Sequence, residues 1–508
     1  MSETTAILNP PEFATTAKPR AGVIARLRIA LGDAVVRKGM LSVFDQAVVS
    51  GTSFVTSVAV GRLCGRTDLG VYYLALSVVL FIRGIQEQII SAPFSVFCHR
   101  RKGVELTSYF GSTLLHQAVV LIATAIGFTG FAWLVAVADA ASVGPEAGSF
   151  RHVAWLLIGV APLLLLRESL RHFAFARLAV RTALAIDVTV AVLQLAGLGV
   201  LTILGELTVG RVYAVMGLAC GFACIVAFRS ANQPAGASPR FGLWREAGAS
   251  ARRLMERHAT LPELIRFNPS RFLPDWKQNW AFSKWALASH LVGCSTPFVL
   301  PWFVAAVDGT AATGLLAACT TLVGLGNAFM MGLANYLTPK AAQSFATGGA
   351  AELRGVLRKT ALLFTLTLGG FALLACIAGD WAAVLIYGND YAGAGPILAV
   401  LALGLFASSL GLTAGNGLWA MEKPAANFRA DVCALIATIV AAVALTPPFG
   451  VLGAASSSLI GATVSAVIRT WTLLRLLREC ETRSSPVGVP TLVGPLCEQW
   501  SHDAHRAD

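Results

Sequence analysis

Long apolar stretches separated by short polar connections run through most of the chain. A helix needs about 20 mainly apolar residues to cross a bilayer, so the pattern predicts an all-α polytopic membrane protein with about 12 transmembrane helices. We expect the spans of the first half near residues 41–62, 70–97, 107–136, 153–175, 181–204 and 209–228. Those of the second half are expected near residues 281–306, 311–337, 358–387, 393–416, 427–447 and 451–476.

One long polar connection, residues 229–280, divides these spans into two sets of six. It predicts a cytoplasmic connector between two six-helix lobes, residues 41–228 and 281–476, arranged around a central cavity. We expect residues 1–40 to form a cytoplasmic N-terminal segment and residues 477–508 a cytoplasmic polar tail.

The start of the second span resembles the start of the eighth. In both, a turn containing Gly or Asp leads to a glycine, Gly70 or Gly314, and then to a long apolar helix. This register matches Arg83 with Asn327. Duplicated transporter halves often retain weak similarity of this kind, and chance similarity between two apolar helices is the alternative.

Basic residues occupy alternate connections, and this sets the expected orientation. Because Lys and Arg are enriched in cytoplasmic loops, we expect a multi-pass protein of the inner membrane with both termini in the cytoplasm. The basic connections contain Arg100, Arg101, Lys102, Arg177, Arg181, Lys340, Arg354, Arg358, Lys359, Lys423 and Arg429. Arg62 and Arg66 break this rule, since they lie in the first outward turn.

The N-terminal segment carries apolar residues at helical spacing between Ile24 and Val35, with basic residues around them. This pattern predicts a short helix on the inner membrane surface. An ordinary basic flank before the first span explains it equally well.

Composition agrees with a membrane protein and changes how the charge is interpreted. The chain has 508 residues, of which 56% are hydrophobic and 13% charged, against about 25% charged in soluble domains. A formal net charge of +12 would suggest nucleic acid in a soluble protein. Basic cytoplasmic loops explain it here, so we expect no nucleic-acid partner.

Motifs for catalysis are absent from the sequence. It has no Gly-rich phosphate loop, no His-Glu-x-x-His and no carboxylate pair on an outward loop, and the ten cysteines show no metal-ligand spacing. We therefore expect a protein that is not an enzyme and holds neither a metal nor a cofactor.

Ionisable and amide side chains lie inside the apolar spans, mostly in the first half. A charge at membrane depth costs at least a few kcal/mol and usually faces a polar cavity. Arg83, for example, lies about 20 Å from the inner end of its span at the rise of an α-helix. The candidates for binding substrate in the central cavity are Arg83, Gln86, Glu87, Arg167, Arg171, His116 and Asn327, whereas Asp45, Glu87 and Asp187 are candidates for coupling to protons or sodium ions.

Two interpretations of these groups remain open. A planar guanidinium donates two parallel hydrogen bonds to phosphate, so the arginines suit an anionic head group. Alternatively, Arg83 pairs with Glu87 one turn away, Glu168 pairs with Arg171, and such pairs only hold helices together.

The segments SVFDQAVVSGTSFVTSVAVGRLCGRTDLGVYYLAL, residues 42–76, and IRGIQEQIISAPF, residues 82–94, resemble a known family. It is the polysaccharide-exporter and O-antigen flippase branch of the multidrug/oligosaccharidyl-lipid/polysaccharide (MOP) flippase superfamily. The resemblance extends over roughly residues 38–478 and is architectural beyond the first two spans.

The resemblance implies a flippase for surface polysaccharide synthesis. Such a protein moves undecaprenyl-diphosphate-linked oligosaccharide across the inner membrane by alternating access. Its partners would be the lipid-linked substrate, membrane lipids and polysaccharide polymerase or assembly proteins.

Three alternatives stay open. A lipid II flippase generally has two further spans, and a drug/cation antiporter would favour acidic groups over the arginines found here. A membrane-embedded glycan polymerase usually needs a large outward loop, and no outward connection of this chain is long.

Overall fold

The computed structural model describes residues 34–98, 100–141, 145–177, 179–231 and 269–483. The surface helix expected within residues 1–40, most of the 229–280 connector and most of the C-terminal tail therefore lie outside the described residues. Within the described ranges the chain forms helices and no strands.

The described residues of the first half form seven α-helices and one π-helical turn. The turn, η1 (Glu87–Ser91), interrupts the second span between α3 and α4. The α-helices are α2 (Ala34–Leu63), α3 (Arg66–Gln86), α4 (Ala92–Phe97), α5 (Gly103–Ala141), α6 (Pro145–Ala176), α7 (Val180–Ile203) and α8 (Val209–Ala231).

In the described part of the second half, several helices follow one another across kinks and share one label. The elements are α11 (Pro269–Phe364), a π-helical turn η2 (Thr365–Gly369), α12 (Gly370–Tyr387), a short 3-10 turn η3 (Asn389–Tyr391), α13 (Gly395–Ala420) and α14 (Pro424–Arg483). Kinks divide α11 at Gly309 and Gly349, and α14 at Gly450.

The expected number of spans is confirmed for the described residues. Nine helical segments there are long and apolar enough to cross a membrane. Dividing two of them at Gly309 and Gly450, and adding the more polar α2, gives twelve segments.

Glycines in matching turns support the internal repeat. Gly65 before α3 and Gly309 within α11 both combine a positive φ, 93° and 85°, with an extended ψ. Residues with a side chain rarely adopt this backbone conformation, so glycine suits both turns. Each turn opens a helix, and Gly70 and Gly314 on these two helices touch: a Cβ on Gly70 would stand 1.9 Å from the Thr310 carbonyl oxygen.

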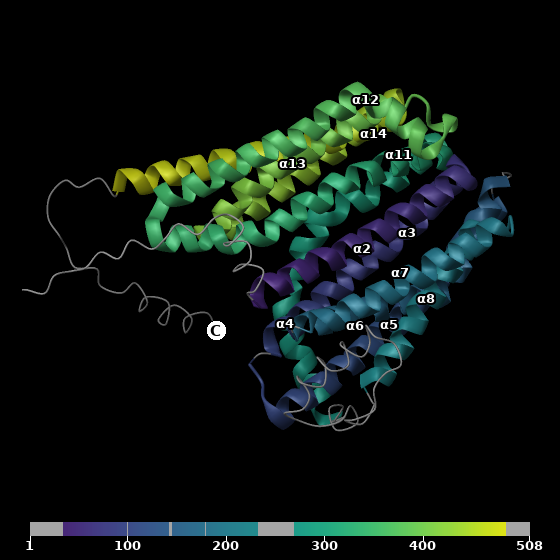
Figure 1. Ribbon diagram of the computed structural model, residues 1–508, viewed down its shortest axis with the longest axis horizontal. Helices are drawn as coiled ribbons and strands as arrows, with labels where there is room; N and C mark the ends of the chain where they lie inside the picture. Colours follow the sequence, from purple (N-terminus) through teal and green to yellow (C-terminus); the bar gives the residue numbers. More distant parts are fainter. Residues whose placement is uncertain (1–33, 99, 142–144, 178, 232–268, 484–508) are drawn as a thin grey trace, which may run out of the picture.

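The helices form two groups that meet at one end (Figure 1). We call it the closed end; here α2 ends, and Arg62 donates hydrogen bonds to the carbonyls of Leu385 and Ile386 at 3.0 and 3.2 Å. Arg66 donates to the Asp390 carbonyl at 3.1 Å. Toward the other end, where α14 finishes, the groups diverge in Figure 1. We call this the basic end.

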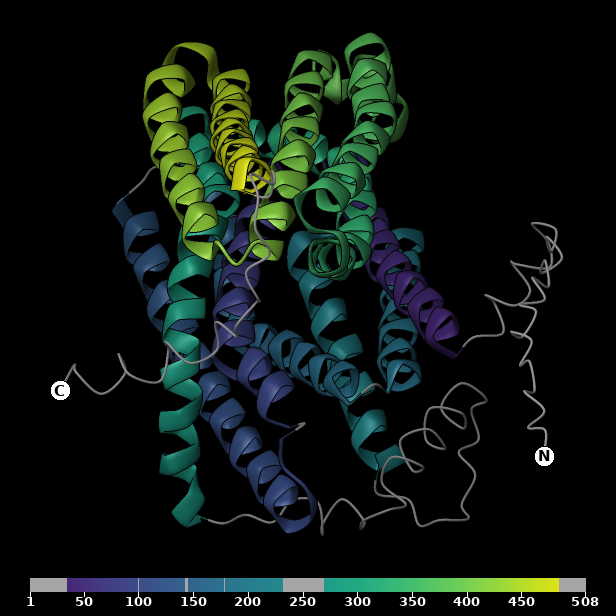
Figure 2. The ribbon, with the colours of Figure 1, turned by 90° about the vertical axis from the view of Figure 1, so that its left-hand side faces the viewer.

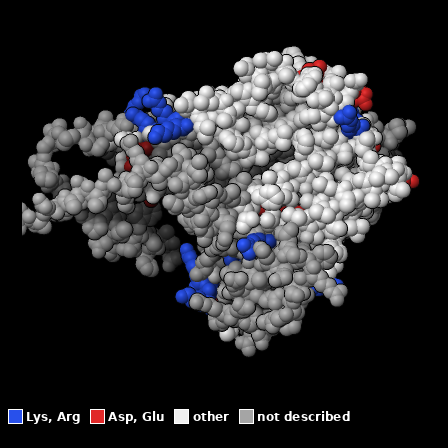
Figure 3. All heavy atoms as spheres, in the orientation of Figure 1, with Lys and Arg blue, Asp and Glu red and all other residues white. Residues whose placement is uncertain are grey.

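On the face shown in Figure 3, Lys and Arg gather toward the basic end, at the left. A smaller charged group lies at the closed end, and the surface between the two groups is mostly uncharged, with a few charged atoms near its middle. Such a band suits a lipid-facing surface.

The first part of α11 packs on the first half of the chain, although the sequence places its span in the C-lobe. Figure 2 shows it running beside α5. Asp275 pairs with Arg101 at 3.1 Å, and Asn279 accepts a hydrogen bond from Tyr109 at 2.9 Å. The helix begins at Pro269, so the last part of the expected connector is helical and continuous with the seventh span.

Candidate functional site

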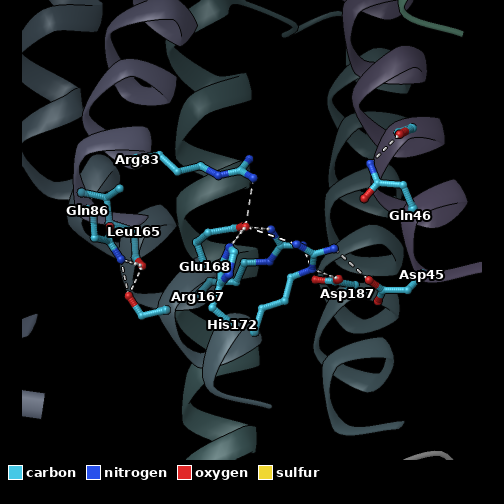
Figure 4. A network of polar contacts seen from close by, with 12 residues as sticks. Asp45, Gln46, Arg83, Gln86, Leu165, Arg167, Glu168, His172 and Asp187 are labelled. Carbon is cyan, nitrogen blue, oxygen red and sulfur yellow. Dashed lines mark hydrogen bonds and ion pairs between the residues drawn. The ribbon is translucent and has the colours of Figure 1, made fainter. Parts of the chain in front are cut away.

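Charged side chains from four helices of the N-lobe meet in one network (Figure 4). Asp45 comes from α2, Arg83 from α3, Asp187 from α7, and α6 contributes a cluster of its own. That cluster consists of Arg167, Glu168, Arg171 and His172, whose spacing of three and four residues places Glu168, Arg171 and His172 on one helix face.

Glu168 is the centre of the network. Its side chain is 5% exposed and pairs with Arg83 at 3.1 Å, Arg167 at 2.9 Å and Arg171 at 3.2 Å. His172 lies 3.1 Å from the same carboxylate. The expected pair of Glu168 with Arg171 is confirmed.

Arg171 joins three carboxylates. Besides Glu168, it binds Asp187 through Nε at 2.7 Å and Asp45 through Nη2 at 2.9 Å. Arg167 also pairs with Asp187. Both aspartate side chains are fully buried, so these ion pairs tie α2, α6 and α7 together at membrane depth.

The three arginines face three carboxylates in this network. Removing charges from water costs several kcal/mol each, and only close, well-hydrogen-bonded pairs offset that cost. With three groups of each sign, the network has no large excess of either charge.

Arg83 differs from the other two arginines. Its side chain is 36% exposed, against 12% for Arg167 and 10% for Arg171. Among the described residues its only ion-pair partner is Glu168. Arg83 therefore retains donors for a ligand.

The expected pair of Arg83 with Glu87 is wrong. Glu87 is half-buried and follows Arg83 by one regular helical turn, since its N–H donates to the Arg83 carbonyl; the π-helical turn η1 begins at Glu87 itself. Glu168 on the neighbouring α6 supplies a desolvated carboxylate instead. Glu87 has no ion pair among the described residues, so the structure does not bring it into the network.

Gln86 lies beside the network in a neutral cluster. Its amide nitrogen donates to Ser169 and to the Leu165 carbonyl at 3.1 Å, both on α6, and to Gln117 on α5 at 3.3 Å. Because Gln86 is 2% exposed, its role in this structure is to join α3 to α5 and α6.

Two further candidate residues do not converge on the network. His116 is fully buried, and its Nε2 lies 3.0 Å from the Phe272 carbonyl at the start of α11. Asn327 is exposed on α11. The sequence could not reveal these positions, because spacing along one helix does not show which neighbouring helix a side chain meets.

A small cavity of about 120 Å³ adjoins Arg167 and Asp187 between α2, α3, α6, α7 and α8. Among the described residues, no group of three or more His, Cys, Asp or Glu is arranged to hold a metal ion. Glu168 and His172 were not chosen as site residues from the sequence; the i, i+3 and i, i+4 spacing around Glu168 is the signal that identifies them.

Comparison with known proteins shows which solved structures share this fold. No protein-family model matches the chain, and no curated protein matches it in sequence. The structure is similar to a multidrug resistance MATE family transporter of the MOP superfamily in an inward-facing conformation, with a TM-score of 0.65 and 12% identity over 91% of this chain and 99% of that one.

Two other solved structures are similar at comparable levels. The lipid II flippase MurJ in an inward closed conformation gives a TM-score of 0.62 and 13% identity, covering 89% of this chain and 94% of MurJ. A MOP superfamily transporter from Pyrococcus furiosus, whose binding pocket is described as having reverse polarity, gives 0.59 and 12%, covering 90% and 98%. The chain therefore has the fold of MOP superfamily transporters.

Proposed function

We propose that this protein is a flippase of the inner membrane that moves a lipid-linked oligosaccharide by alternating access. The lipid carrier would be undecaprenyl diphosphate, and both termini would lie in the cytoplasm. The fold shared with MOP transporters supports a transporter. The likeness of residues 42–76 and 82–94 to polysaccharide exporters supports the substrate class.

One observation carries the proposal: Arg83 is a half-exposed guanidinium beside a balanced, buried ion-pair network. A diphosphate arriving from the open basic end would accept hydrogen bonds from its unused donors. Glu168 would remain paired with Arg167 and Arg171, so Arg83 can change partner without leaving a buried carboxylate unpaired.

The three network carboxylates supply the alternative function, a drug/cation antiporter. Asp45, Glu168 and Asp187 match the arginines in number. Coupling to protons or sodium ions through Asp45 or Asp187 is compatible with either function, whereas Glu87 lies apart from this group.

Gene deletion distinguishes the two functions. The flippase proposal expects lipid-linked oligosaccharide to accumulate on the cytoplasmic leaflet, which leaflet-selective labelling would measure. It also expects the amount of surface polysaccharide to fall, which extraction and quantification of the glycan would measure. Normal surface glycan together with new sensitivity to cationic drugs would support the antiporter instead.

A further inference from the structure

The C-lobe contains a cavity of about 490 Å³ that the proposed site does not use. It lies where α11, α13 and the two arms of α14 meet near the basic end (Figure 1). Its polar lining consists of Thr338, Asn416, Asn427 and Arg469, and the ring of Trp419 forms another part of the wall.

This cavity occupies the place in the C-lobe that the ion-pair network occupies in the N-lobe. Gly415 follows Arg171, and Asp431 follows Asp187, by the same number of residues that separates the matching turns at Gly65 and Gly309. In the N-lobe, the Arg171 side chain fills this position and binds Asp187 at 2.7 Å. In the C-lobe, glycine leaves the space empty, and Arg469 on α14 pairs with Asp431 at 2.6 Å.

Two buried polar atoms beside Gly415 have no hydrogen-bond partner among the residues that the structure describes. Asn427 is 5% exposed; its amide nitrogen donates to the Gly415 carbonyl at 3.1 Å, which leaves Oδ1 as an unused acceptor. Arg469 Nε is an unused donor. A Cβ placed on Gly415 would stand 3.1 Å from Asn427 Oδ1 and 3.7 Å from Arg469 Nε, so both atoms border the space that the missing side chain leaves.

The pair of unused groups favours a ligand that both donates and accepts hydrogen bonds. A phosphate or carboxylate only accepts hydrogen bonds and would leave the Asn427 acceptor unpaired, whereas an ammonium only donates. A hydroxyl does both, and a buried polar group left without a partner is costly. The exposed ring of Trp419, 59% accessible, offers an apolar face to the C–H side of a sugar ring.

We infer that this C-lobe cavity binds a sugar residue of the transported glycan, through hydroxyl groups that bridge Asn427 and Arg469. The inference rests on the proposed function and deepens it. The diphosphate is assigned to Arg83 in the N-lobe, and the glycan to the cavity beside Gly415 in the C-lobe.

Photocrosslinking in glycan-producing cells tests the assignment. The full chain carries p-benzoylphenylalanine in place of Trp419, or in place of Trp381 as the control, an exposed tryptophan on α12. Irradiation is expected to give a sugar-bearing adduct from position 419 only, detected by periodate oxidation of the purified protein. Absence of sugar on the 419 adduct in cells that export glycan normally would overturn the inference.

Filling the cavity provides the second arm. Gly415→Leu is expected to lower the 419 adduct by about tenfold, equivalent to about 1.4 kcal/mol, and Gly415→Ala to lower it less. Gly324→Leu is the matched control, because a Cβ at Gly324 meets no atom within 4 Å. Adduct levels are normalised to protein level; an undiminished adduct in both Gly415 variants would also overturn the inference.

Gene deletion and photocrosslinking together separate this inference from the proposed function. Unchanged surface glycan after gene deletion would overturn the function, whatever the adduct contains. Reduced glycan after deletion, with no sugar-bearing adduct at position 419, would overturn only the C-lobe assignment.

Discussion

Arg83 and Arg171 belong to the same ion-pair network, yet they differ in exposure and in the number of carboxylates they bind. Arg171 holds Asp45, Glu168 and Asp187 together, whereas in the described part of the chain Arg83 forms an ion pair with Glu168 only and is 36% exposed. Losing Arg83 leaves Glu168 with other cationic partners. Losing Arg171 leaves Asp45 without its ion pair at membrane depth.

Replacing Arg83 is expected to stop transport without loss of protein. Arg83→Ala should abolish glycan export normalised to membrane protein level, and Arg83→Lys should restore it only in part, because an ammonium lacks the fork geometry. The double variant Arg83→Ala with Glu168→Gln provides the control. If export returned in the double variant, the role of Arg83 would be to neutralise Glu168, and Arg83 would not be a substrate-binding residue.

Replacing Arg171 is expected to destabilise the fold. Breaking a buried ion pair by removing one partner costs about 3–5 kcal/mol, so Arg171→Met should lower membrane protein level and thermal unfolding temperature far more than Arg83→Met. Adding Asp45→Asn and Asp187→Asn should recover much of the stability. Equal stability of the two single arginine variants would contradict this account.

At the scale of elements, the contact between α3 and α11 closes one end of the molecule. Gly70 and Gly314 allow the two helix starts to touch, and the Arg62 and Arg66 guanidiniums bind carbonyls at the far end of α12 and in η3. These two arginines are the exceptions to the charge pattern. Their role in joining the halves explains why basic residues occur in an expected outward turn.

A side chain on Gly70 should force the closed end apart. Gly70→Val places a Cβ within 1.9 Å of the Thr310 carbonyl oxygen. Because this oxygen belongs to the backbone, the two helices must move apart to relieve the clash. Spin labels at Leu63 and Asn389, both exposed at this end, should show a longer distance between the labels in the variant when measured by double electron–electron resonance. Transport by the variant should fall.

Gly127→Val on α5 is the matched control, because a Cβ there meets no atom within 4 Å. An unchanged label distance in Gly70→Val would show that the helices accommodate the side chain without opening. The closed end would then not depend on this glycine contact.

At the scale of the whole molecule, the two ends differ in charge and in how closely the lobes approach. Basic connections gather at the end toward which the lobes diverge, and the interlobe hydrogen bonds of Arg62 and Arg66 lie at the other. If the basic end faces the cytoplasm, this conformation is open inward.

Cysteine labelling in a background without native cysteines tests that orientation. Asn389→Cys and Glu206→Cys, exposed at the closed end, should react with an impermeant reagent added outside cells. Lys102→Cys and Glu352→Cys, exposed at the basic end, should react only after the membrane is opened. Labelling of Lys102→Cys from outside would show that the orientation is opposite to the one expected.

The amino-acid sequence was enough to predict the helical membrane class and the twelve segments, and it suggested a register for an internal repeat. Apolar length and turn glycines are local properties, so stretches such as 181–204 and the pairing of Gly70 with Gly314 were accessible without a structure. The presence of charges at membrane depth was also readable, because any such charge stands out against an apolar span.

Which of these charges meet depends on how the helices pack against one another. Arg171 and Asp45 are 126 positions apart, and no periodicity within either helix specifies that contact. Arg83 was expected to pair with Glu87 by helical spacing, but the neighbouring helix α6 brings Glu168 within 3.1 Å of it. Ion pairing in a bundle depends on how neighbouring helices rotate and cross, and that is set by packing of the whole chain.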